Sequence, residues 1–235
     1  MKSLFAFTLA VLFLVTCAAA QNDVTKIASR TDLYHVHFAK ASLGKAAEEA
    51  NYLKTPDPNN PMGAHFIVLR HQDGDDWDYV VIEHLGTSTS LKANPAPPPP
   101  GMRELNAWHT DTFVNGPSWP DFVKVMGLGD EASKTAGAVY VVSVYRAAPG
   151  HREELEKQLS EAPNAGDTVA GMVLMQHLEG AAWQFLGISR YNSWQDFATG
   201  ESASVAMTNK GQGGWARLRD VSSYHTDTIA DRIAP

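Results

Sequence analysis

The sequence predicts an α+β fold built from two copies of a β-α-β-β-α-β unit, and three observations support this prediction. The chain of 235 residues repeats itself at an offset of 106 residues (140 minus 34). Each copy contains segments in which apolar and polar residues alternate, as they do in half-buried strands. In each copy an acidic residue followed by glycine, Asp73-Gly74 or Glu179-Gly180, comes after the second such segment, where a hairpin turn is expected.

The repeat continues without a gap over most of each copy, and such self-similarity decides how the fold is interpreted. The aligned identities include Tyr34 with Tyr140, Val36 with Val142, Ala41 with Ala147, Gly44 with Gly150, Glu48 with Glu154, Leu53 with Leu159, His71 with His177, Gly74 with Gly180, Trp77 with Trp183 and Ile82 with Ile188. The sequence His-Thr-Asp-Thr also occurs twice, at 109–112 and 225–228, with an offset of 116 (225 minus 109). The second copy therefore holds ten extra residues (116 minus 106) before this motif.

The elements of the first copy follow from its periodicity and its turn residues. Strands are predicted at 33–39, 65–71 and 77–85, with a fourth around His109, and a helix at 45–54 follows the break at Gly44. The second copy repeats this order. Its strands are predicted at 139–145, 172–177 and 183–191, with a fourth around His225, and its helices at 151–159 and 193–198.

The first copy departs from this order where its second helix belongs. Prolines at 95 and 97–100 cannot lie inside a helix, so a proline-rich extended excursion is predicted at 93–101. The segment 118–122, Ser-Trp-Pro-Asp-Phe, resembles the start of the helix predicted at 193–198, but it comes after the fourth strand. The sequence leaves open whether this likeness is accidental or marks a rearranged helix.

The first twenty residues are typical of an export signal. Lys2 precedes an apolar run from Leu4 to Val15, which is too short to span a membrane, and small residues at 18–20 suit cleavage after Ala20. We therefore expect an exported protein, periplasmic or secreted, with no stable membrane insertion after cleavage. The alternative is a lipoprotein acylated on Cys17.

The domain boundaries follow from the signal and the repeat. The predicted segments are a signal peptide (1–20), an N-terminal linker (21–32), the first repeat (33–116), a connecting segment (117–137) and the second repeat (138–235). After cleavage the chain has no cysteine, so neither disulfides nor thiolate ligands are expected. The net charge of −7 argues against a nucleic-acid partner, because phosphate neutralisation needs clustered Lys and Arg.

The regions 34–85 and 140–197 resemble the dimeric α/β-barrel superfamily of ferredoxin-like domains, and the string Ala-Pro-Gly-His-Arg-Glu-Glu-Leu at 148–155 is the most family-like part. The resemblance implies two four-stranded antiparallel sheets that pack into one barrel, closed here within a tandem chain. It also implies a ligand site in the barrel cavity. The superfamily includes cofactor-free monooxygenases, isomerases and haem-dependent enzymes, so the fold does not choose the function.

A histidine and a tryptophan flank each predicted hairpin, His71 with Trp77 and His177 with Trp183. Across a short turn the two side chains of each pair would touch on one face of the sheet. A packing pair that supports the hairpin is one interpretation. The other is a ligand site at the barrel mouth, where imidazole exchanges protons and indole holds a flat molecule. The residues predicted to contact a ligand are Trp77, Tyr79, Trp183 and Phe185.

The repeated His-Thr-Asp-Thr motif places His109 and Asp111, and likewise His225 and Asp227, on one face of a strand. A carboxylate beside an imidazole fixes its tautomer and raises its basicity, which suits a general base. The alternative is that the motif ends a strand and caps the segment after it.

His35 and His37 lie two residues apart on the first predicted strand, so both imidazoles face the same way. Such a pair can chelate a metal ion, and His65, Glu83 and His84 are conceivable third ligands. The second copy has Val141 and Ser143 in place of the two histidines, so this site would exist only once.

These features predict an exported barrel protein that binds a small, partly apolar molecule in the barrel cavity without a cofactor. One alternative is a cofactor-independent monooxygenase or isomerase of an aromatic substrate, with His71, His109, His177 or His225 as the base. A second is a haem-binding barrel whose iron ligand is His177 or His225, and a divalent metal is a further cofactor option. A structural or assembly role is the last. The sequence leaves the oligomeric state open, including a homo-oligomer.

Overall fold

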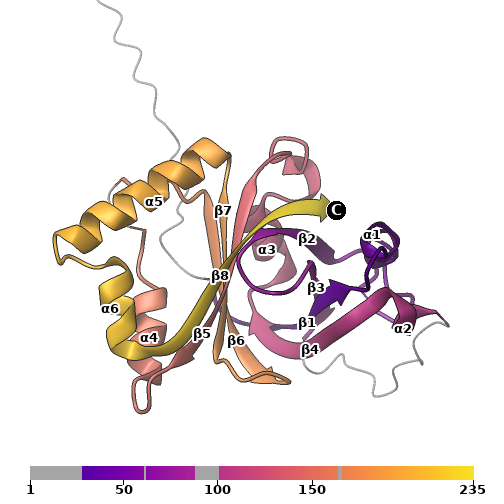
Figure 1. The fold of residues 1–235 in the computed structure, drawn as a ribbon, viewed down its shortest axis with the longest axis horizontal. Coiled ribbons are helices and arrows are strands. Elements are labelled where there is room, and N and C mark those ends of the chain that lie inside the picture. The colour runs from indigo at the N-terminus through magenta and orange to yellow at the C-terminus, as the bar shows by residue number, and fades with distance from the viewer. Residues whose placement is uncertain (1–27, 61, 88–100, 164–165) are drawn as a thin grey trace, which may run out of the picture.

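The computed structural model describes residues 28–60, 62–87, 101–163 and 166–235. Its strands form one closed antiparallel barrel in the order β1-β3-β2-β8-β5-β7-β6-β4 (Figure 1). The predicted signal peptide with Cys17, most of the linker and nearly all of the proline-rich excursion lie outside the described residues.

Each half contributes four neighbouring strands. The first half contains β1 (Asp32–Ala41), α1 (Ala46–Leu53), β2 (Phe66–Asp73), β3 (Tyr79–Gly86), α2 (Met102–Leu105) and β4 (Asn106–Gly116). The connection contains α3 (Trp119–Met126) and a 3-10 turn (Gly129–Glu131). The second half contains β5 (Val139–Ala147), α4 (Arg152–Leu159), β6 (Gly171–Glu179), β7 (Phe185–Tyr191), α5 (Trp194–Asn209), α6 (Gly214–Val221) and β8 (Ser222–Ala234).

The predicted fold class is confirmed. The first half forms the sheet β4-β1-β3-β2 and the second forms β8-β5-β7-β6, and pairing of β2 with β8 and β4 with β6 closes the barrel. The ten extra residues of the second copy belong to a region with two helices, α5 and α6, of which only the start of α5 was predicted. Between β3 and β4 the only described helix is α2, with four residues.

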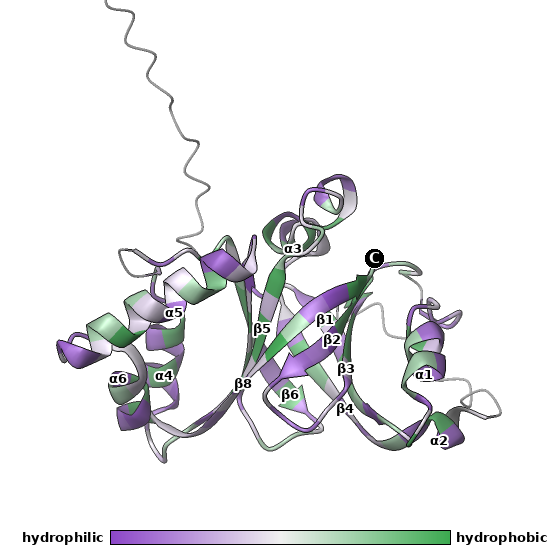
Figure 2. Ribbon diagram, turned by 45° about the horizontal axis from the view of Figure 1, so that its top comes forward, coloured by the Kyte–Doolittle hydropathy of each residue, from purple (hydrophilic) through white to green (hydrophobic). Residues whose placement is uncertain are grey.

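Alternation along the strands divides the apolar residues between two kinds of core. Inward-facing side chains of both sheets, such as Tyr34, Val36, Tyr140 and Val142, form one buried cluster inside the barrel. On the outer faces, α1 packs on β2 and β3, while α4 and α6 pack on the second sheet. Figure 2 shows α4, α5 and α6 beside one sheet, α1 and α2 beside the other, and α3 at one end of the barrel.

Each hairpin turn of one half lies against the last strand of the other half. Gly74, with φ of +129°, approaches the carbonyl oxygen of Asp227, and Gly180, with φ of +101°, approaches that of Asp111. A Cβ at either glycine would overlap the facing backbone, so only glycine allows this approach. The two turns therefore hold the halves together in the same way.

The connecting segment is bound by equivalent tyrosines from both halves. The buried Tyr34 hydroxyl donates to the carbonyl of Pro117 at 2.8 Å, and the buried Tyr140 hydroxyl donates to that of Met126 at 3.0 Å. These bonds position α3 across the end of the barrel. None of the helices in the described part of the chain has the length and apolar character of a membrane span.

The likeness between 118–122 and the start of α5 extends to the structure. Ser118 caps α3 and Ser193 caps α5, each accepting a hydrogen bond from the amide of the aspartate three residues later. The two helices nevertheless lie in different places, because α3 follows β4 whereas α5 precedes β8.

Candidate functional site

Five ionisable residues gather on the outer face of the first sheet, and we call them the histidine–aspartate cluster: His35, His37, Glu83, His109 and Asp111. The register of the strands brings them together, because His35 pairs with Glu83 of β3 and His37 pairs with Asp111 of β4. His109 lies two residues before Asp111, so its side chain faces the same way. Two groups of candidates that the sequence left separate thus form one site.

Asp111 is the centre of this cluster. Its Oδ1 is 2.9 Å from His35 Nε2 and 2.8 Å from His37 Nδ1, while its Oδ2 is 3.5 Å from His109 Nε2. An ionised carboxylate only accepts hydrogen bonds, so both bonded ring nitrogens carry protons. Asp111 therefore holds a proton on Nε2 of His35 and on Nδ1 of His37.

His35 lies between two carboxylates. Its other ring nitrogen, Nδ1, is 3.6 Å from Glu83 Oε2. Burial lowers the pKa of His35, but its hydrogen bonds with Asp111 and Glu83 outweigh burial and raise the pKa to about 9. Burial alone would raise the pKa of Asp111, yet the two imidazoles hold it well below its usual range. At neutral pH His35 is therefore a cation and Asp111 an anion.

His37 differs from His35 because one of its nitrogens has no partner. The residue is 7% exposed, and its Nε2 is buried without a hydrogen-bond partner among the described residues. The ring stacks on His109 with centroids 5.3 Å apart, and the His109 side chain is 48% exposed. With Nδ1 bonded to Asp111, the Nε2 of His37 is left unpaired beneath a solvent-facing ring.

The corresponding face of the second half carries different chemistry. Val141 and Ser143 replace the two histidines of β1, and His225 Nε2 is 3.8 Å from Asp227 Oδ2. The ring of His225 stacks on Tyr145, and burial raises the pKa of that tyrosine far above its usual range. The predicted His225–Asp227 pair therefore forms without a second imidazole to share the carboxylate.

A second cluster of imidazoles lies at the barrel end occupied by α3. His84 Nε2 is 2.7 Å from Asp32 Oδ2, and His84 Nδ1 is 3.3 Å from His65 Nδ1. The Trp119 indole stacks on both rings, at 4.8 Å from His65 and 5.5 Å from His84. Desolvation, followed by the neighbouring His84, lowers the pKa of His65.

The predicted His–Trp pairs touch as the hairpin geometry requires. The ring centroids are 5.7 Å apart for His71 and Trp77 and 4.8 Å apart for His177 and Trp183. Both tryptophans pack against the barrel core, and His71 Nε2 is buried without a partner among the described residues. These pairs close the barrel at the end away from α3, and their role in binding stays a prediction.

Tyr79 and Phe185, two predicted ligand contacts, lie on the outer faces beneath helices. Tyr79 packs against α1 and donates its hydroxyl to the carbonyl of Ala46, while Phe185 packs with Leu155 of α4. They do not face the barrel interior, because their strands place them on the opposite side from Val80 and Leu186.

The described residues show no group of three or more His, Cys, Asp or Glu placed to hold a metal ion. Of the predicted third ligands, Glu83 lies beside His35, but His84 contacts Tyr34 and faces the barrel interior with its neighbour His65. Metal binding by His35 and His37 stays a prediction.

The predicted haem ligands, His177 and His225, lie in different surroundings. His177 Nε2 accepts a hydrogen bond from the amide of Ala181 at 3.0 Å, and His225 lies against Tyr145. His225 Nδ1 is buried without a hydrogen-bond partner among the described residues, and haem binding by His177 or His225 stays a prediction.

The sequence reasoning missed Asp32 and Trp119 as parts of a site. Asp32 lies at the end of the predicted linker, and Trp119 lies in the segment 118–122, for which the sequence leaves the position of a helix open. Alternate residues of a strand share a face, so Asp32 is expected on the same face as Tyr34. Trp119 lies over the imidazoles only because of the position of α3.

Known proteins share the fold of this chain. No family model matches the sequence, and no curated protein matches it. An anthrone oxidase-like protein of known structure aligns over 87% of this chain and 92% of its own, with a TM-score of 0.58 and 11% identity. A protein from Lactobacillus acidophilus NCFM, assigned provisionally as a monooxygenase, aligns over 86% of this chain and 94% of its own, with a TM-score of 0.50 and 9% identity. At these identities the likeness establishes a shared dimeric α/β-barrel fold.

Proposed function

We propose that this chain binds a small, partly apolar molecule that carries a hydroxyl or N–H group, and that the histidine–aspartate cluster recognises that group. The observation that carries the proposal is the unpartnered Nε2 of His37, whose other ring nitrogen is bonded to Asp111. A buried acceptor without a donor is costly, and a ligand donor would satisfy it.

The charges of the cluster favour a neutral donor as the ligand. Asp111 and Glu83 bring two carboxylates to the cluster beside the cationic His35, and this disfavours an anionic ligand. Phe113, half-buried, lies 5.4 Å from the His35 ring and offers an apolar contact. A phenol or a similar hydroxyl compound on a flat apolar frame matches these groups.

We place this ligand on the outer face and not in the predicted cavity inside the barrel. The inward-facing positions carry large side chains, among them Tyr34, Tyr140 and Met175, that are fully buried against one another. A ligand would have to separate these contacts to enter. On the outer face, Asp111 and His109 are already about half exposed.

The test compares two probes that share one frame, 2-naphthol and 2-methoxynaphthalene, by ligand-observed NMR. We expect the naphthol to bind the wild-type protein more tightly than the ether, and His37→Phe to remove this preference. His225→Phe removes the imidazole of the second half, whose Nδ1 is also buried without a partner among the described residues, and it should keep the preference. Equal binding of both probes, or a preference that survives in His37→Phe, would overturn the proposal.

Proton abstraction from such a ligand is the second candidate, which corresponds to a cofactor-independent monooxygenase or isomerase. An imidazole whose Nδ1–H is held by a carboxylate is the arrangement of a general base, and His37 with Asp111 has it. In this step the hydroxyl proton would pass to His37 Nε2. Oxygen uptake with hydroxyaromatic compounds, absent in His37→Phe and present in His225→Phe, is the expected result.

A further inference from the structure

The two halves differ in a groove between their first helix and the hairpin strands beneath it. The helices α1 and α4 start and end 106 residues apart, and Arg70 pairs with Tyr79 as Gln176 pairs with Phe185. The two grooves are therefore equivalent places in the fold, and their linings can be compared position by position.

The groove of the second half already holds a cation from the chain itself. Arg30, before β1, donates to Glu156 of α4 at 2.5 Å and to the carbonyl of Leu174 at 3.0 Å. Its guanidinium lies 5.7 Å from the centre of the Phe185 ring, and the side chain is 15% exposed. Glu156 forms an ion pair with the Arg30 guanidinium, and the Phe185 ring makes a cation–π contact with it.

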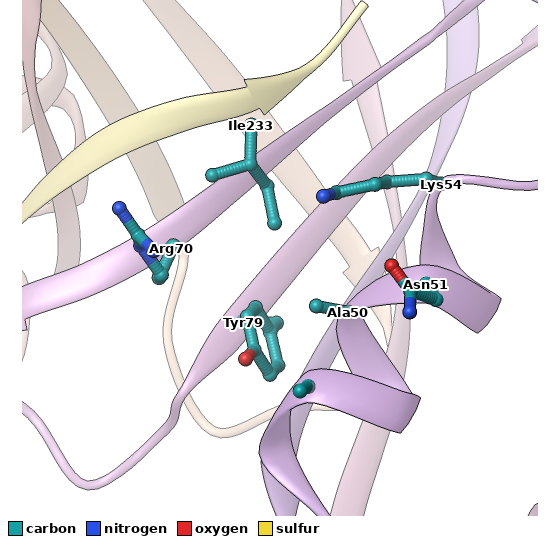
Figure 3. Close-up of a pocket in the computed structure, with 7 residues that line it drawn as sticks. Ala50, Asn51, Lys54, Arg70, Tyr79 and Ile233 are labelled. Carbon is teal, nitrogen blue, oxygen red and sulfur yellow. The ribbon is translucent and has the colours of Figure 1, made fainter.

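In the first half the equivalent positions lack the carboxylate and carry a cation of their own. At an offset of 106 residues, Ala50 stands in place of Glu156 and Arg70 in place of Gln176. Tyr79 stands in place of Phe185, so this position stays aromatic. No described segment enters this groove as Arg30 enters the other. What remains is a pocket of about 380 Å³, whose residues appear in Figure 3.

The lining of this pocket combines apolar side chains with two cations, Lys54 and Arg70. Ala50, the ring of Tyr79 and Ile233 form its apolar part, and Lys54 extends over the gap between Ile233 and Tyr79 (Figure 3). The Tyr79 hydroxyl is bonded to Ala46, so the tyrosine offers only its ring.

Only one of the two cations is neutralised. Asp231 binds Arg70 through two bonds of 3.0 and 2.8 Å, whereas the Lys54 ammonium has no ion pair within the described residues. With Lys54, Arg70 and Asp231 charged, the pocket has a net charge of +1 on a chain whose net charge is −7.

We infer that the groove between α1 and strands β2 and β3 binds a small organic carboxylate, whose charge lies between Lys54 and Arg70 and whose apolar body covers Ala50, Tyr79 and Ile233. A single net positive charge suits a monoanion, and the apolar floor suits an organic body over an inorganic ion. The volume suits a molecule at the small end of ligand size. This site is separate from the histidine–aspartate cluster and does not depend on its function.

Benzoate and its neutral isostere benzamide test the site. We expect benzoate to shift the NMR signals of the Ala50 methyl and the Tyr79 ring in a saturable way, and benzamide to leave them unchanged. Lys54→Gln should weaken benzoate binding about tenfold, the effect of losing one favourable charge contact worth ~1.4 kcal/mol. Because Lys54 is exposed, this variant should keep the fold.

Two further variants sharpen the test. Ala50→Glu places the carboxylate of the second-half groove in this one, and it should abolish benzoate binding. Lys157→Gln changes an α4 lysine at the position equivalent to Asn51 (157 minus 106) and should have no effect. Equal binding of benzoate and benzamide, or unchanged binding in Lys54→Gln, would overturn the inference. The naphthol experiment tests the histidine–aspartate cluster alone, so a negative result in either experiment does not change the conclusion of the other.

Discussion

Glu49 and Leu155 occupy equivalent positions of α1 and α4 (155 minus 106 is 49), and both side chains are fully buried. Leu155 packs into the outer core of the second half. Neither carboxyl oxygen of Glu49 has a hydrogen-bond partner among the described residues. Burial, reinforced by the nearby Asp78, raises the pKa of Glu49 from 4.5 to about 7.

Glu49→Leu should therefore change how stability depends on pH. Between pH 4.5 and 7 the folded chain keeps a proton on Glu49 that the unfolded chain has released, so the free energy of unfolding falls as pH rises. This loss is at most ~3 kcal/mol above pH 7. Urea unfolding at pH 5 and pH 8 should show a smaller fall for Glu49→Leu than for the wild type. Glu48→Gln, an exposed neighbour, is the control, and an identical pH dependence in wild type and Glu49→Leu would refute the prediction.

Gly180→Ala should destabilise the junction between the halves. The new Cβ would meet the carbonyl of Asp111, and φ of +101° already disfavours alanine, so we expect a loss of ~2 kcal/mol or more. Gly150→Ala also has a positive φ, +84°, but no atom lies within 4 Å of its Cβ. The difference between the two variants in the free energy of unfolding, measured by heat or urea, gives the cost of the steric contact with β4. Equal losses would mean that the contact with β4 contributes nothing.

Asp111→Asn should lower the pKa of His35 from about 9. The hydrogen bond with Asp111 is the largest influence that raises this pKa, and Glu83 alone remains in the variant. Loss of a neighbouring carboxylate typically changes a pKa by about 1 to 3 units. The His35 ring signal, followed by NMR against pH, reports the change. Asp227→Asn in the second half should leave the His35 titration where it is, and a His35 midpoint unmoved by Asp111→Asn would disprove the assigned role.

Tyr140→Phe should weaken the attachment of the connecting segment. The variant leaves the carbonyl of Met126 without its buried donor, which costs about 1 to 3 kcal/mol. Tyr34→Phe should have the same effect through Pro117. Urea unfolding of each variant and of the double variant measures both bonds. Full stability in both single variants would show that neither bond holds the segment.

The His65 ring should titrate below 6.5, its ordinary pKa, because burial and His84 lower its pKa. A lowered pKa means that the His65 contribution to stability is present above pH 6.5 and is lost as pH falls through the folded value. Trp119→Leu removes part of the aromatic cover and should raise the midpoint toward 6.5. The measurement is again NMR of the ring signal, and a midpoint above 6.5 in the wild type would contradict the expectation.

The repeat offset and the alternation of apolar residues were enough to predict the order of most elements. The helix predicted at 45–54 is α1, and the hairpins at Gly74 and Gly180 form where the turn residues indicated. Local periodicity decides these features, because each strand or helix must present one apolar face to a core. The sequence did not indicate α6, because its cap, Gly213, and its first residue, Gly214, are both glycine and resemble a loop more than the start of a helix.

The site was predictable only in parts. The pairs His35–His37 and His109–Asp111 follow from the period of two, since both members must share a face. Their union around Asp111 depends on the register between β1 and β4, which links residues 74 positions apart. Sequence periodicity does not encode register between strands distant along the chain. The stack of Trp119 on His65 and His84 likewise needed the position of α3.

The sequence by itself determined that this protein consists of two similar halves with alternating strands, and which of their side chains could share a face. Only the tertiary structure decided that Asp111 binds two imidazoles and that each glycine turn packs onto the opposite half. It also decided that Arg30 occupies the groove of the second half, whereas the equivalent groove of the first half stays open. The physical reason is that periodicity acts over a few residues, whereas these contacts arise when the barrel closes and brings distant strands into register.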